Sequence, residues 1–404
     1  MHTSDRQLGF YKIAIILGLL SAIGPFAIDM YLPALPQISQ FYQVGVAEVQ
    51  FSLTVFLIAQ SVSQLFYGPL SDKFGRKPPL FFGMGIFFVA TIGCIFASSL
   101  DELIFYRFFQ GIGAAAGIVI ARAIVRDLYT GVMATKLMSL LMLVFGISPI
   151  LAPLVGSTIL TLTDWRGIFV LVAICAGLGL LLIQFGLRES QSLEERLHTR
   201  SQGSSVKAYF VLLKDKHYMG LVFACSFALA NFFIYLANSP FVLIEHYGLN
   251  ETQYGLAFGL NAMCFFLAAQ FNGRLCSLYG IENVIRVGKW ICALAMCCMT
   301  SLYLVGFDSL YLFMGCYLIA SAGVGLVIPT TSILAMENHG RIAGTASALL
   351  GTMQMAIGPI FIAILSPFMN KEPLPMILGM TCCSLIALLF VSFTLAKKIP
   401  FVKA

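Results

Sequence analysis

The chain has 404 residues, of which 59% are hydrophobic and 10% are charged. A soluble domain carries roughly 25% charged residues, so this composition excludes an ordinary water-facing surface and indicates that most of the surface faces lipid. The formal net charge of +6 is small, and no basic aromatic patch points to nucleic acid as a partner.

A membrane-spanning helix needs about 20 apolar residues, and a chain of this length has room for about twelve such helices joined by short loops. The apolar run near the N-terminus continues past Ala22 to Leu35, which favours a first span over a cleaved signal peptide. We predict an all-α membrane protein with twelve transmembrane helices, at residues 12–34, 49–69, 79–98, 103–124, 137–162, 166–187, 217–240, 252–273, 284–305, 309–332, 342–367 and 374–396.

The longest polar stretch lies at the middle of the chain, from Arg188 to Lys216, and is charged and rich in Ser and Gln. Such a composition is typical of a solvated linker between two halves. We expect an N-terminal six-helix bundle at residues 1–190, a cytoplasmic linker at 191–216 and a C-terminal six-helix bundle at 217–404.

Orientation follows from the positions of Lys and Arg, which favour the cytoplasmic side of a membrane. With a cytoplasmic N-terminus, all 24 Lys and Arg residues except Arg107, Arg166 and Lys371 fall in cytoplasmic segments, and Lys289 is counted among them. This asymmetry predicts that both termini are cytoplasmic and that the chain is a multi-pass protein of the inner membrane.

The two halves share a pattern of small residues. Four positions between the second and third helices of the first half recur at one offset in the second half, namely Gly68, Leu70, Gly75 and Gly83 as Gly273, Leu275, Gly280 and Gly288. Repeated halves are typical of transporters that open a central site to one side of the membrane and then to the other.

The most specific motif is GPLSDKFGRK, from Gly68 to Lys77. Its glycines permit a tight turn and a close approach of helices, and its charges stand where they can meet helix ends and partner charges. The alternative is a basic loop that only sets the topology.

This stretch resembles the loop signature of the major facilitator superfamily, a Gly-x-Leu-x-Asp-x-x-Gly-Arg-Lys pattern after the second helix. RFFQGIGAAAG at 107–117 resembles the fourth-helix motif of that superfamily, and GISPILAPLVG at 146–156 resembles the fifth-helix Gly/Pro motif of its antiporters. The latter departs from the usual form, with Ser148-Pro149 and Ala152-Pro153 where Gly-Pro is commoner.

Four further stretches resemble the bicyclomycin/chloramphenicol-resistance subfamily of drug:proton antiporters. They are AIDMYLPALP at 27–36, ARAIVRDLY at 121–129, DWRGIF at 164–169 and GTASALLGT at 344–352. The resemblance implies the fold of that superfamily and proton-coupled efflux of small amphiphilic drugs, such as bicyclomycin, chloramphenicol or tetracycline-like compounds.

The resemblance also implies a conformational latch. Asp72 would face the start of the eleventh helix, whose dipole favours an anion, and Arg76 would pair with Asp127 below the fourth helix. The expected latch residues are Gly68, Asp72, Gly75, Arg76, Lys77, Arg122 and Asp127, and the expected antiporter-motif residues are Gly146, Pro149, Pro153 and Gly156.

Asp29 and Arg107 are the candidates for proton coupling. An ionisable group within a span is costly and is usually functional, and these are the one carboxylate and the one base well inside the predicted spans. At 1.5 Å per residue both lie within roughly 6–9 Å of the same membrane surface, so we expect them to pair. The alternative is a fixed ion pair that only sets helix packing.

A wider set of polar and apolar side chains is predicted at cavity depth. An apolar cavity with few polar groups suits broad specificity, although each member can equally serve helix packing. The substrate-binding candidates are Phe26, Met30, Tyr31, Gln60, Gln64, Gln110, Phe145, Asn231, Tyr235, Asn238, Asn261, Met353 and Gln354.

Other classes of protein find little support. No phosphate-binding loop indicates an ATP-driven pump, no nucleophile-base set indicates an enzyme, and no Cys/His spacing indicates a metal site. We expect no cofactor, a drug substrate and protons as partners, the lipid bilayer as surroundings, and a monomer. The alternative function is transport of a natural metabolite such as a peptide, siderophore or sugar by the same fold.

Overall fold

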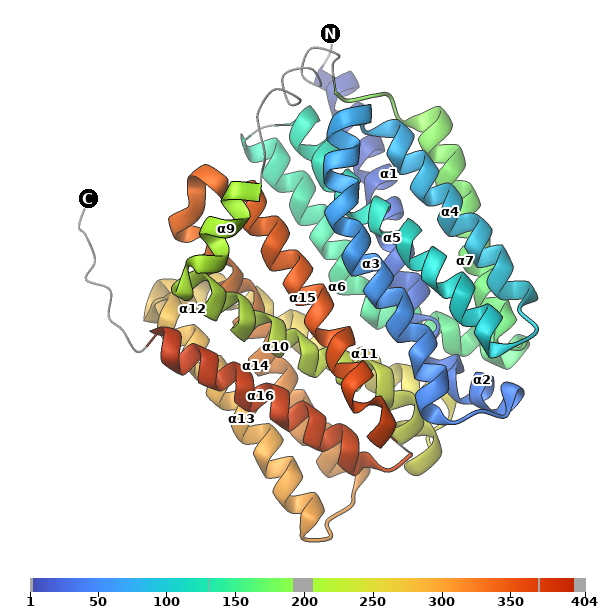
Figure 1. Cartoon of the computed structure of the whole chain (residues 1–404), viewed down its shortest axis with the longest axis vertical. Coiled ribbons are helices and arrows are strands. Elements are labelled where there is room, and N and C mark those ends of the chain that lie inside the picture. The colour runs from blue at the N-terminus through green and yellow to red at the C-terminus, as the bar shows by residue number, and fades with distance from the viewer. Residues whose placement is uncertain (1–2, 130, 192–205, 370, 396–404) are drawn as a thin grey trace. The chain divides into compact units, whose positions relative to one another are not determined.

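A computed structural model describes residues 3–129, 131–191, 206–369 and 371–395. These residues form helices and loops, with no strand among them (Figure 1). By its internal contacts the chain divides into two units. Unit 1 comprises Met1–Gly203 and Leu249–Gly259, and unit 2 comprises Ser204–Gly248 and Leu260–Ala404.

The helices of unit 1 run almost without interruption from the start of the described chain. They are α1 Thr3–Asp29, η1 Leu32–Ala34, α2 Leu35–Tyr42, α3 Val46–Phe74, α4 Lys77–Phe96, α5 Leu100–Leu128, α6 Gly131–Leu162, α7 Arg166–Leu181 and η2 Leu182–Gly186.

The second part of the chain contains a similar series. Its helices are α9 Val206–Lys214, α10 Lys216–Pro240, η3 Phe241–His246, α11 Glu251–Gln270, α12 Asn272–Tyr279, α13 Ile281–Leu304, α14 Leu310–Met336, η4 Glu337–Ile342, α15 Ala343–Leu365, η5 Ser366–Phe368 and α16 Pro373–Leu395. The division between the units falls within α11.

Eleven helical stretches in the described residues are long and apolar enough to cross a membrane. α6 has 32 residues, and its part Gly146–Leu162 is a shorter apolar helix. Large apolar side chains cover the outside of these helices, among them Phe96, Phe185 and Phe393, each more than three-quarters exposed. Such surfaces are stable against lipid and not against water, so the chain is a multi-pass membrane protein.

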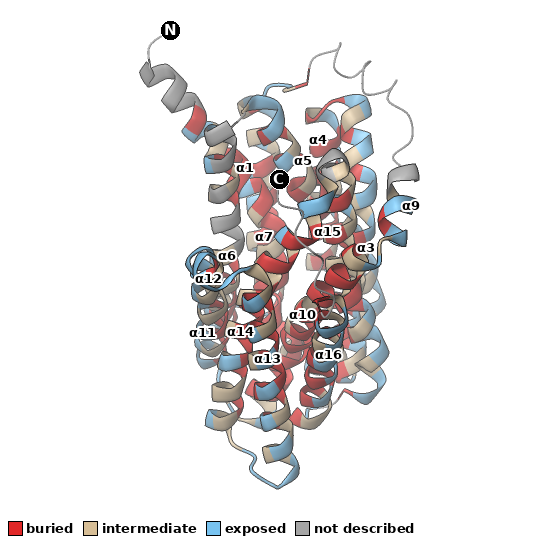
Figure 2. Ribbon diagram, turned by 90° about the vertical axis from the view of Figure 1, so that its left-hand side faces the viewer, coloured by how far each residue is buried: buried red, intermediate tan, exposed pale blue. Residues whose placement is uncertain are grey.

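Small residues allow the helices of unit 1 to pack closely. A Cβ atom added at Gly111 of α5 would lie 2.3 Å from the backbone oxygen of Phe56 in α3, and one at Gly117 would lie 2.5 Å from that of Leu20 in α1. Close backbone approach at small residues is the usual means of helix association in membranes. Figure 2 shows the buried residues gathered along the helix faces that contact one another.

The sequence repeat has a structural counterpart in both units. Gly75 and Gly280 each have a positive φ, of 89° and 81°, where one helix ends and the next begins. A Cβ added at Gly113 would meet Gly83 O and Phe87 N, and a Cβ added at Gly323 would meet Gly288 O and Cys292 N. The α4–α5 crossing and the α13–α14 crossing are therefore built alike.

Three features differ from the sequence-based expectations. α1 ends at Asp29, and a turn and η1 carry the helical path on into α2, so that one candidate span runs from Phe10 to Tyr42, beyond the expected end at residue 34. The chain contains Pro25, Pro33 and Pro36, and proline removes a helical hydrogen-bond donor. The expected linker at 191–216 contains α9, whose Leu212 is buried in the core of unit 2.

Lys289 is the third correction. Its position five residues into the expected ninth span was counted with the cytoplasmic charges, but α13 begins at Ile281 and the lysine side chain is fully buried. Arg107 is therefore not the only base inside a span.

Candidate functional site

Asp29 stands at the last residue of α1, with 4% of its surface exposed. The hydroxyl of Ser148 in α6 donates a hydrogen bond of 3.1 Å to Asp29 Oδ2. α6 touches the same end of α1 a second time, because a Cβ added at Gly156 would lie 2.4 Å from the backbone oxygen of Met30. The fifth-helix motif thus holds the backbone and the carboxylate at the end of α1.

Arg107 lies in the interior of α5 and is fully buried. Its Nη1 donates a hydrogen bond of 2.6 Å to Gln110 Oε1, and Gln110 Nε2 donates one of 2.8 Å to Thr91 Oγ1 of α4. The Nε and Nη2 atoms of Arg107 have no hydrogen-bond partner among the described residues. Gln110 therefore fixes the arginine and ties α5 to α4.

Aromatic rings enclose the Arg107 guanidinium. Its central carbon lies 4.3 Å from the ring centroid of Phe56, 4.4 Å from that of Tyr31 and 6.0 Å from that of Phe169. Tyr31 is itself fixed by a hydrogen bond of 2.7 Å with Ser52 Oγ. The negative faces of aromatic rings attract a guanidinium, and they provide a large part of its surroundings here.

The expected ion pair between Asp29 and Arg107 is not formed, because the ion pairs of the described residues include neither side chain. The depth argument concerned only the distance of each residue from the membrane surface and not the direction of its side chain. The Asp29 carboxylate bonds to α6, while Arg107 bonds within α5 and stacks on aromatic rings. In this conformation, the carboxylate has a hydroxyl as its partner and the arginine has an amide.

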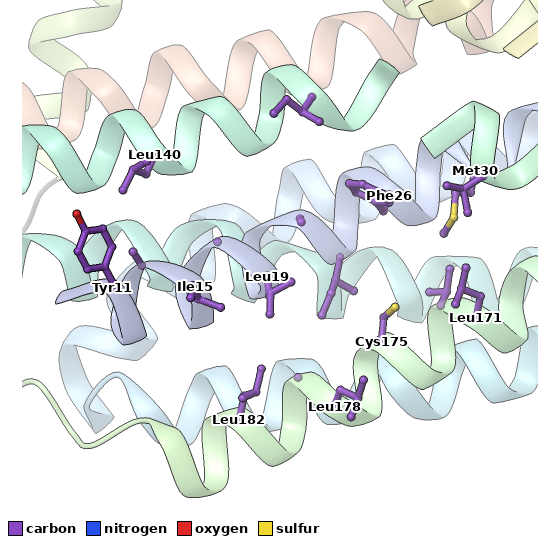
Figure 3. A pocket seen from close by; sticks show the side chains of 18 residues that line it. Tyr11, Ile15, Leu19, Phe26, Met30, Leu140, Leu171, Cys175, Leu178 and Leu182 are labelled. Atoms are coloured by element: carbon purple, nitrogen blue, oxygen red, sulfur yellow. The ribbon is translucent and has the colours of Figure 1, made fainter. Parts of the chain in front are cut away.

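An apolar cavity of about 690 Å³ lies between α1, α6 and α7 of unit 1 (Figure 3). Along α1 its wall runs from Tyr11 to Met30, the residue after Asp29. Leu171, Cys175 and Leu178 of α7 face this wall in Figure 3. The predicted substrate residues Phe26 and Met30 are both part of the lining, so two of the predicted apolar contacts share one cavity, whereas Asp29, the residue before Met30, is not part of its lining.

The loop between α3 and α4 carries a cluster of charges around Arg76. Its Nε and Nη2 donate hydrogen bonds of 2.8 and 3.2 Å to the two carboxylate oxygens of Asp127, and its Nη1 donates to Ser71 and to Asp72. Burial alone would lower the pKa of Arg76, but the hydrogen bonds and charges of Asp127 and Asp72 outweigh it, and the pKa is raised above its ordinary value.

Glu189 completes this cluster and was not among the sequence-based candidates. Its carboxylate accepts hydrogen bonds from the backbone N–H groups of Arg76, at 2.8 Å, and of Lys77, at 3.1 Å. These groups form the N-terminus of α4, where an anion is favoured. The only feature of the sequence that pointed to Glu189 was its position as an acidic residue at the start of the polar stretch.

Arg122, which was expected in the same latch, has an exposed side chain on α5.

The remaining residues of the predicted latch and antiporter motif lie within helices or at their ends. Gly68 has open space around its Cα, since an added Cβ would meet no atom within 4 Å. Lys77 Nζ donates a hydrogen bond of 2.8 Å to Gln184 O. Pro149 and Pro153 lie inside α6, and Gly146 lies in the same helix.

The polar candidates of unit 2 connect helices to one another. Asn231 Nδ2 donates to Met380 O and Ser384 Oγ of α16, at 3.0 and 2.8 Å. Asn261 Nδ2 donates to Tyr235 Oη at 2.9 Å. Asn231 and Asn261 also line a small cavity of about 10 Å³, which is about the space of one water molecule.

Five further candidates are scattered over both units. In unit 2, Gln354 Nε2 lies 2.8 Å from Cys225 Sγ, and Asn238 donates a hydrogen bond to the backbone of its own helix. Met353 packs against the apolar core of the same unit. In unit 1, Gln60 is buried in α3, and Gln64 is half-buried one turn further along that helix. The side chain of Phe145 lies outside the described residues. The predicted set is therefore not one constellation within either unit.

Residues 17–363 match the family model of the Major Facilitator Superfamily. The chain belongs to this superfamily. It is 34% identical over 352 residues to a Bacillus subtilis protein named uncharacterized MFS-type transporter YdgK, covering 86% of this chain and 87% of that protein.

Two other relatives carry names that refer to drugs. The chain is 29% identical over 404 residues to the bicyclomycin resistance protein homolog of Haemophilus influenzae, covering 98% of this chain and 99% of that one. It is 30% identical over 367 residues to multidrug resistance protein D of Escherichia coli, covering 89% of both chains. The resemblance to the bicyclomycin/chloramphenicol-resistance subfamily is thereby confirmed.

Solved structures support the fold alone. The chain is similar to the xylose transporter XylE of E. coli in a partially occluded inward-open conformation, with a TM-score of 0.75, 14% identity and 98% and 99% coverage of the two chains. A bacterial homologue of the lysosomal transporter Spinster matches with a TM-score of 0.74 at 14% identity, covering 95% and 96%. The all-helical superfamily fold predicted from the sequence is confirmed.

Proposed function

We propose that this protein is a proton-coupled multidrug antiporter that exports small amphiphilic compounds across the inner membrane by alternating access. The observation that carries the proposal is the apolar cavity whose wall ends at Met30, the residue that follows the buried Asp29 in the chain. A cavity of that volume lies within the usual range of small-molecule sites, which is about 300–1,000 Å³. The names of the relatives, which refer to bicyclomycin and to multidrug resistance, support the same class of substrate.

The proposed topology has twelve transmembrane helices with both termini cytoplasmic, and the protein works as a monomer. α6 is counted as the twelfth span because its 32 residues exceed the length that crosses the hydrocarbon core. The domain boundaries follow the sequence prediction of two six-helix bundles at 1–190 and 217–404, except that α9 within the predicted linker at 191–216 packs on the second bundle through Leu212. In this orientation the charge cluster around Arg76 lies at the cytoplasmic side.

Asp29 is the proposed proton carrier. When the site opens to the outside, the carboxylate takes up a proton, and when the site opens to the cytoplasm the proton is released. The neutral acid is compatible with the apolar wall at Met30, whereas the ionised acid requires the hydroxyl of Ser148 or water. A substrate that enters the cavity changes the equilibrium between the neutral and the ionised form of Asp29. Substrate and proton therefore compete, and this competition is the basis of antiport.

Arg107 has a supporting role in this proposal. A guanidinium stays protonated at all physiological pH values, so it supplies a constant positive charge near the site while Asp29 alternates. Its aromatic surroundings and its bond to Gln110 hold that charge in place. Rearrangement of these contacts during the cycle brings the charge and the carboxylate closer or further apart.

The Arg76 cluster is the proposed conformational latch. Its ion pair with Asp127 joins the α3–α4 loop to the end of α5, and the backbone hydrogen bonds to Glu189 join the same loop to the segment after η2. Contacts at one side of the membrane stabilise the state in which that side is closed. We propose that Asp72 exchanges its bond with Arg76 for a partner on the eleventh span when the transporter changes state.

The experiment that tests the proposed function uses inside-out vesicles with a pH-sensitive dye and an acidified lumen. Bicyclomycin, chloramphenicol, tetracycline and ethidium are added in turn to vesicles that contain the transporter. Release of lumenal protons on addition of a compound identifies both substrate and coupling. If none of these compounds releases protons, drug:proton antiport is contradicted and transport of a natural metabolite becomes the better account.

A further inference from the structure

Lys289 is a fully buried lysine in the interior of unit 2. It stands about 12 Å along α13 from the start of that helix at Ile281. Its Nζ has no hydrogen-bond partner among the described residues. The proposed function assigns this side chain no role.

Three buried cysteines lie near Lys289, one on each of three helices. They are Cys292 of α13, Cys225 of α10 and Cys383 of α16. The ion pairs of the described residues do not include the lysine. Its charge, when present, therefore has no fixed counter-charge in this packing.

The internal repeat shows that packing does not require a lysine here. Because Gly288 corresponds to Gly83, the next residue, Lys289, corresponds to Met84 of unit 1. Met84 is 1% exposed, and its Sδ and Cε lie within van der Waals reach of a Cβ added at Gly117 or Gly179. An apolar side chain of similar length thus fills the same place in unit 1.

An ammonium ion without a partner in a low-dielectric interior carries a large free-energy penalty, and such a group gives up its proton instead. Ionisable groups inside membrane spans are rare because of this penalty, and they are usually functional. Lysine can lose its proton where arginine cannot. The amine therefore fits a group that is neutral when packed and charged when its surroundings open to water.

We propose that Lys289 is a second proton-binding site of the transport cycle, located in unit 2 and separate from Asp29. It is a neutral amine in the packed conformation, and it takes up a proton when α10 and α16 move away from α13 and admit water. This inference rests on the proposed proton coupling, and it adds a second protonation step to that at Asp29.

Proton counting in proteoliposomes tests this assignment. Purified wild type, Lys289→Met and Met84→Leu are compared for protons released per molecule of chloramphenicol taken up. Lys289→Met copies the residue of the equivalent position, so we expect it to fold, to keep transporting and to lose half of the proton-to-substrate ratio. Met84→Leu is the matched control with an unchanged ratio. An unchanged ratio in Lys289→Met would overturn the proposal.

A second measurement needs no substrate and so separates this inference from the proposed antiport. If Lys289 is neutral when folded and protonated when unfolded, unfolding takes up a proton and stability rises with pH. Between pH 6 and pH 9 the Tm of wild type should therefore rise more than that of Lys289→Met, while Lys289→Arg, which stays charged, should be the least stable of the three. Parallel Tm curves for wild type and Lys289→Met would contradict a neutral Lys289. If the wild type releases no protons with chloramphenicol, the antiport proposal fails. The Tm comparison then decides by itself whether Lys289 is neutral in the folded protein.

Discussion

At the scale of single residues, Asp29 and Ser148 form the contact on which the coupling proposal depends. Asp29 is the only acidic side chain classed as buried in the described part of the chain. Ser148 is fully buried beside it and donates the hydrogen bond. A hydrogen bond to an ionised carboxylate favours the charged form, so the serine sets how readily Asp29 gains and loses its proton.

Ser148→Ala should move the pH dependence of transport to higher pH. Loss of the hydroxyl removes a hydrogen bond to a charged group, which contributes roughly 1.5 kcal/mol, and a change of about 1.4 kcal/mol corresponds to one pH unit. We therefore expect a shift of up to about one unit in the pH profile of chloramphenicol transport by vesicles.

Ser148→Thr is the matched control, because threonine keeps the hydroxyl. It should retain the wild-type pH profile, even if its extra methyl group slows transport. A profile of Ser148→Ala that overlies that of wild type would show that the hydrogen bond does not influence the proton carrier.

The sequence identified Asp29 and Arg107 as buried charges, but it placed them together incorrectly. Composition shows which charges lie within apolar runs, since a span tolerates few of them. It does not show which neighbouring helix a side chain meets, and the Asp29 carboxylate meets Ser148 of α6. Ser148 was visible only as a departure from the Gly-Pro form of the fifth-helix motif, with no sign of its partner.

At the scale of helices, α6 and the end of α1 form one packed element. Gly156 permits the contact, because a Cβ there would lie 2.4 Å from Met30 O, far inside the normal separation. Pro149 and Pro153, each of which removes a helical hydrogen-bond donor, lie in the same part of α6. We therefore expect the motif at 146–156 to act through the backbone geometry next to Asp29.

Gly156→Ala should displace the end of α1 and reduce transport by about tenfold, since overpacking costs about 1–3 kcal/mol. Initial rates of chloramphenicol efflux and the amount of folded protein after purification are the measurements. Gly85→Ala of α4 is the control, because a Cβ there meets no atom within 4 Å. Equal transport by the two variants would remove the role assigned to the Gly156 contact.

The Arg76–Asp127 pair should be measurable as a coupling between helices. Asp127→Asn weakens the bidentate bond, and we expect a loss of about 1–2 kcal/mol, at the lower end for a charged hydrogen bond because Asp127 is partly exposed. Thermal unfolding of Arg76→Gln, Asp127→Asn and the double variant gives the coupling energy. Additive losses of stability would mean that the two side chains do not stabilise each other.

Sequence patterns predicted most helices, because an apolar run of about 20 residues can cross a membrane and satisfy its own backbone hydrogen bonds only as a helix. The motif from Gly68 to Lys77 also indicated a charged turn, and the structure places Arg76 against Asp127 there. Two features escaped because they depend on tertiary contacts: Glu189 caps α4 from a distant segment, and Lys289 is buried although its sequence position suggests a helix end.

At the scale of the whole molecule, the cavity of unit 1 suggests how an apolar substrate reaches the carboxylate. Its α1 wall extends from Tyr11 to Met30, which is about 28 Å of helix at 1.5 Å per residue and close to the thickness of the hydrocarbon core. An amphiphilic compound that partitions into the bilayer finds a continuous apolar surface along this wall, with Asp29 next to its end.

Cys175 provides a natural probe of this cavity, because it is exposed and part of the lining. Alkylation by a membrane-permeant maleimide should be slowed by chloramphenicol at Cys175 but not at Cys382, which is exposed on α16 and is absent from this lining. Peptide mass spectrometry of the labelled protein measures both sites at once. Equal protection of both cysteines, or of neither, would argue against binding of substrate in the cavity.

Uphill export by Asp29→Asn is the most direct measure of the central claim. Purified wild type and Asp29→Asn are reconstituted in proteoliposomes, a pH gradient is imposed, and accumulation of chloramphenicol is followed with and without a protonophore. We predict that the wild type accumulates the compound only while the gradient lasts. Asp29→Asn, which cannot exchange a proton at this position and which we expect to fold, should only equilibrate the compound. Gradient-driven accumulation by Asp29→Asn at the wild-type rate would contradict the account.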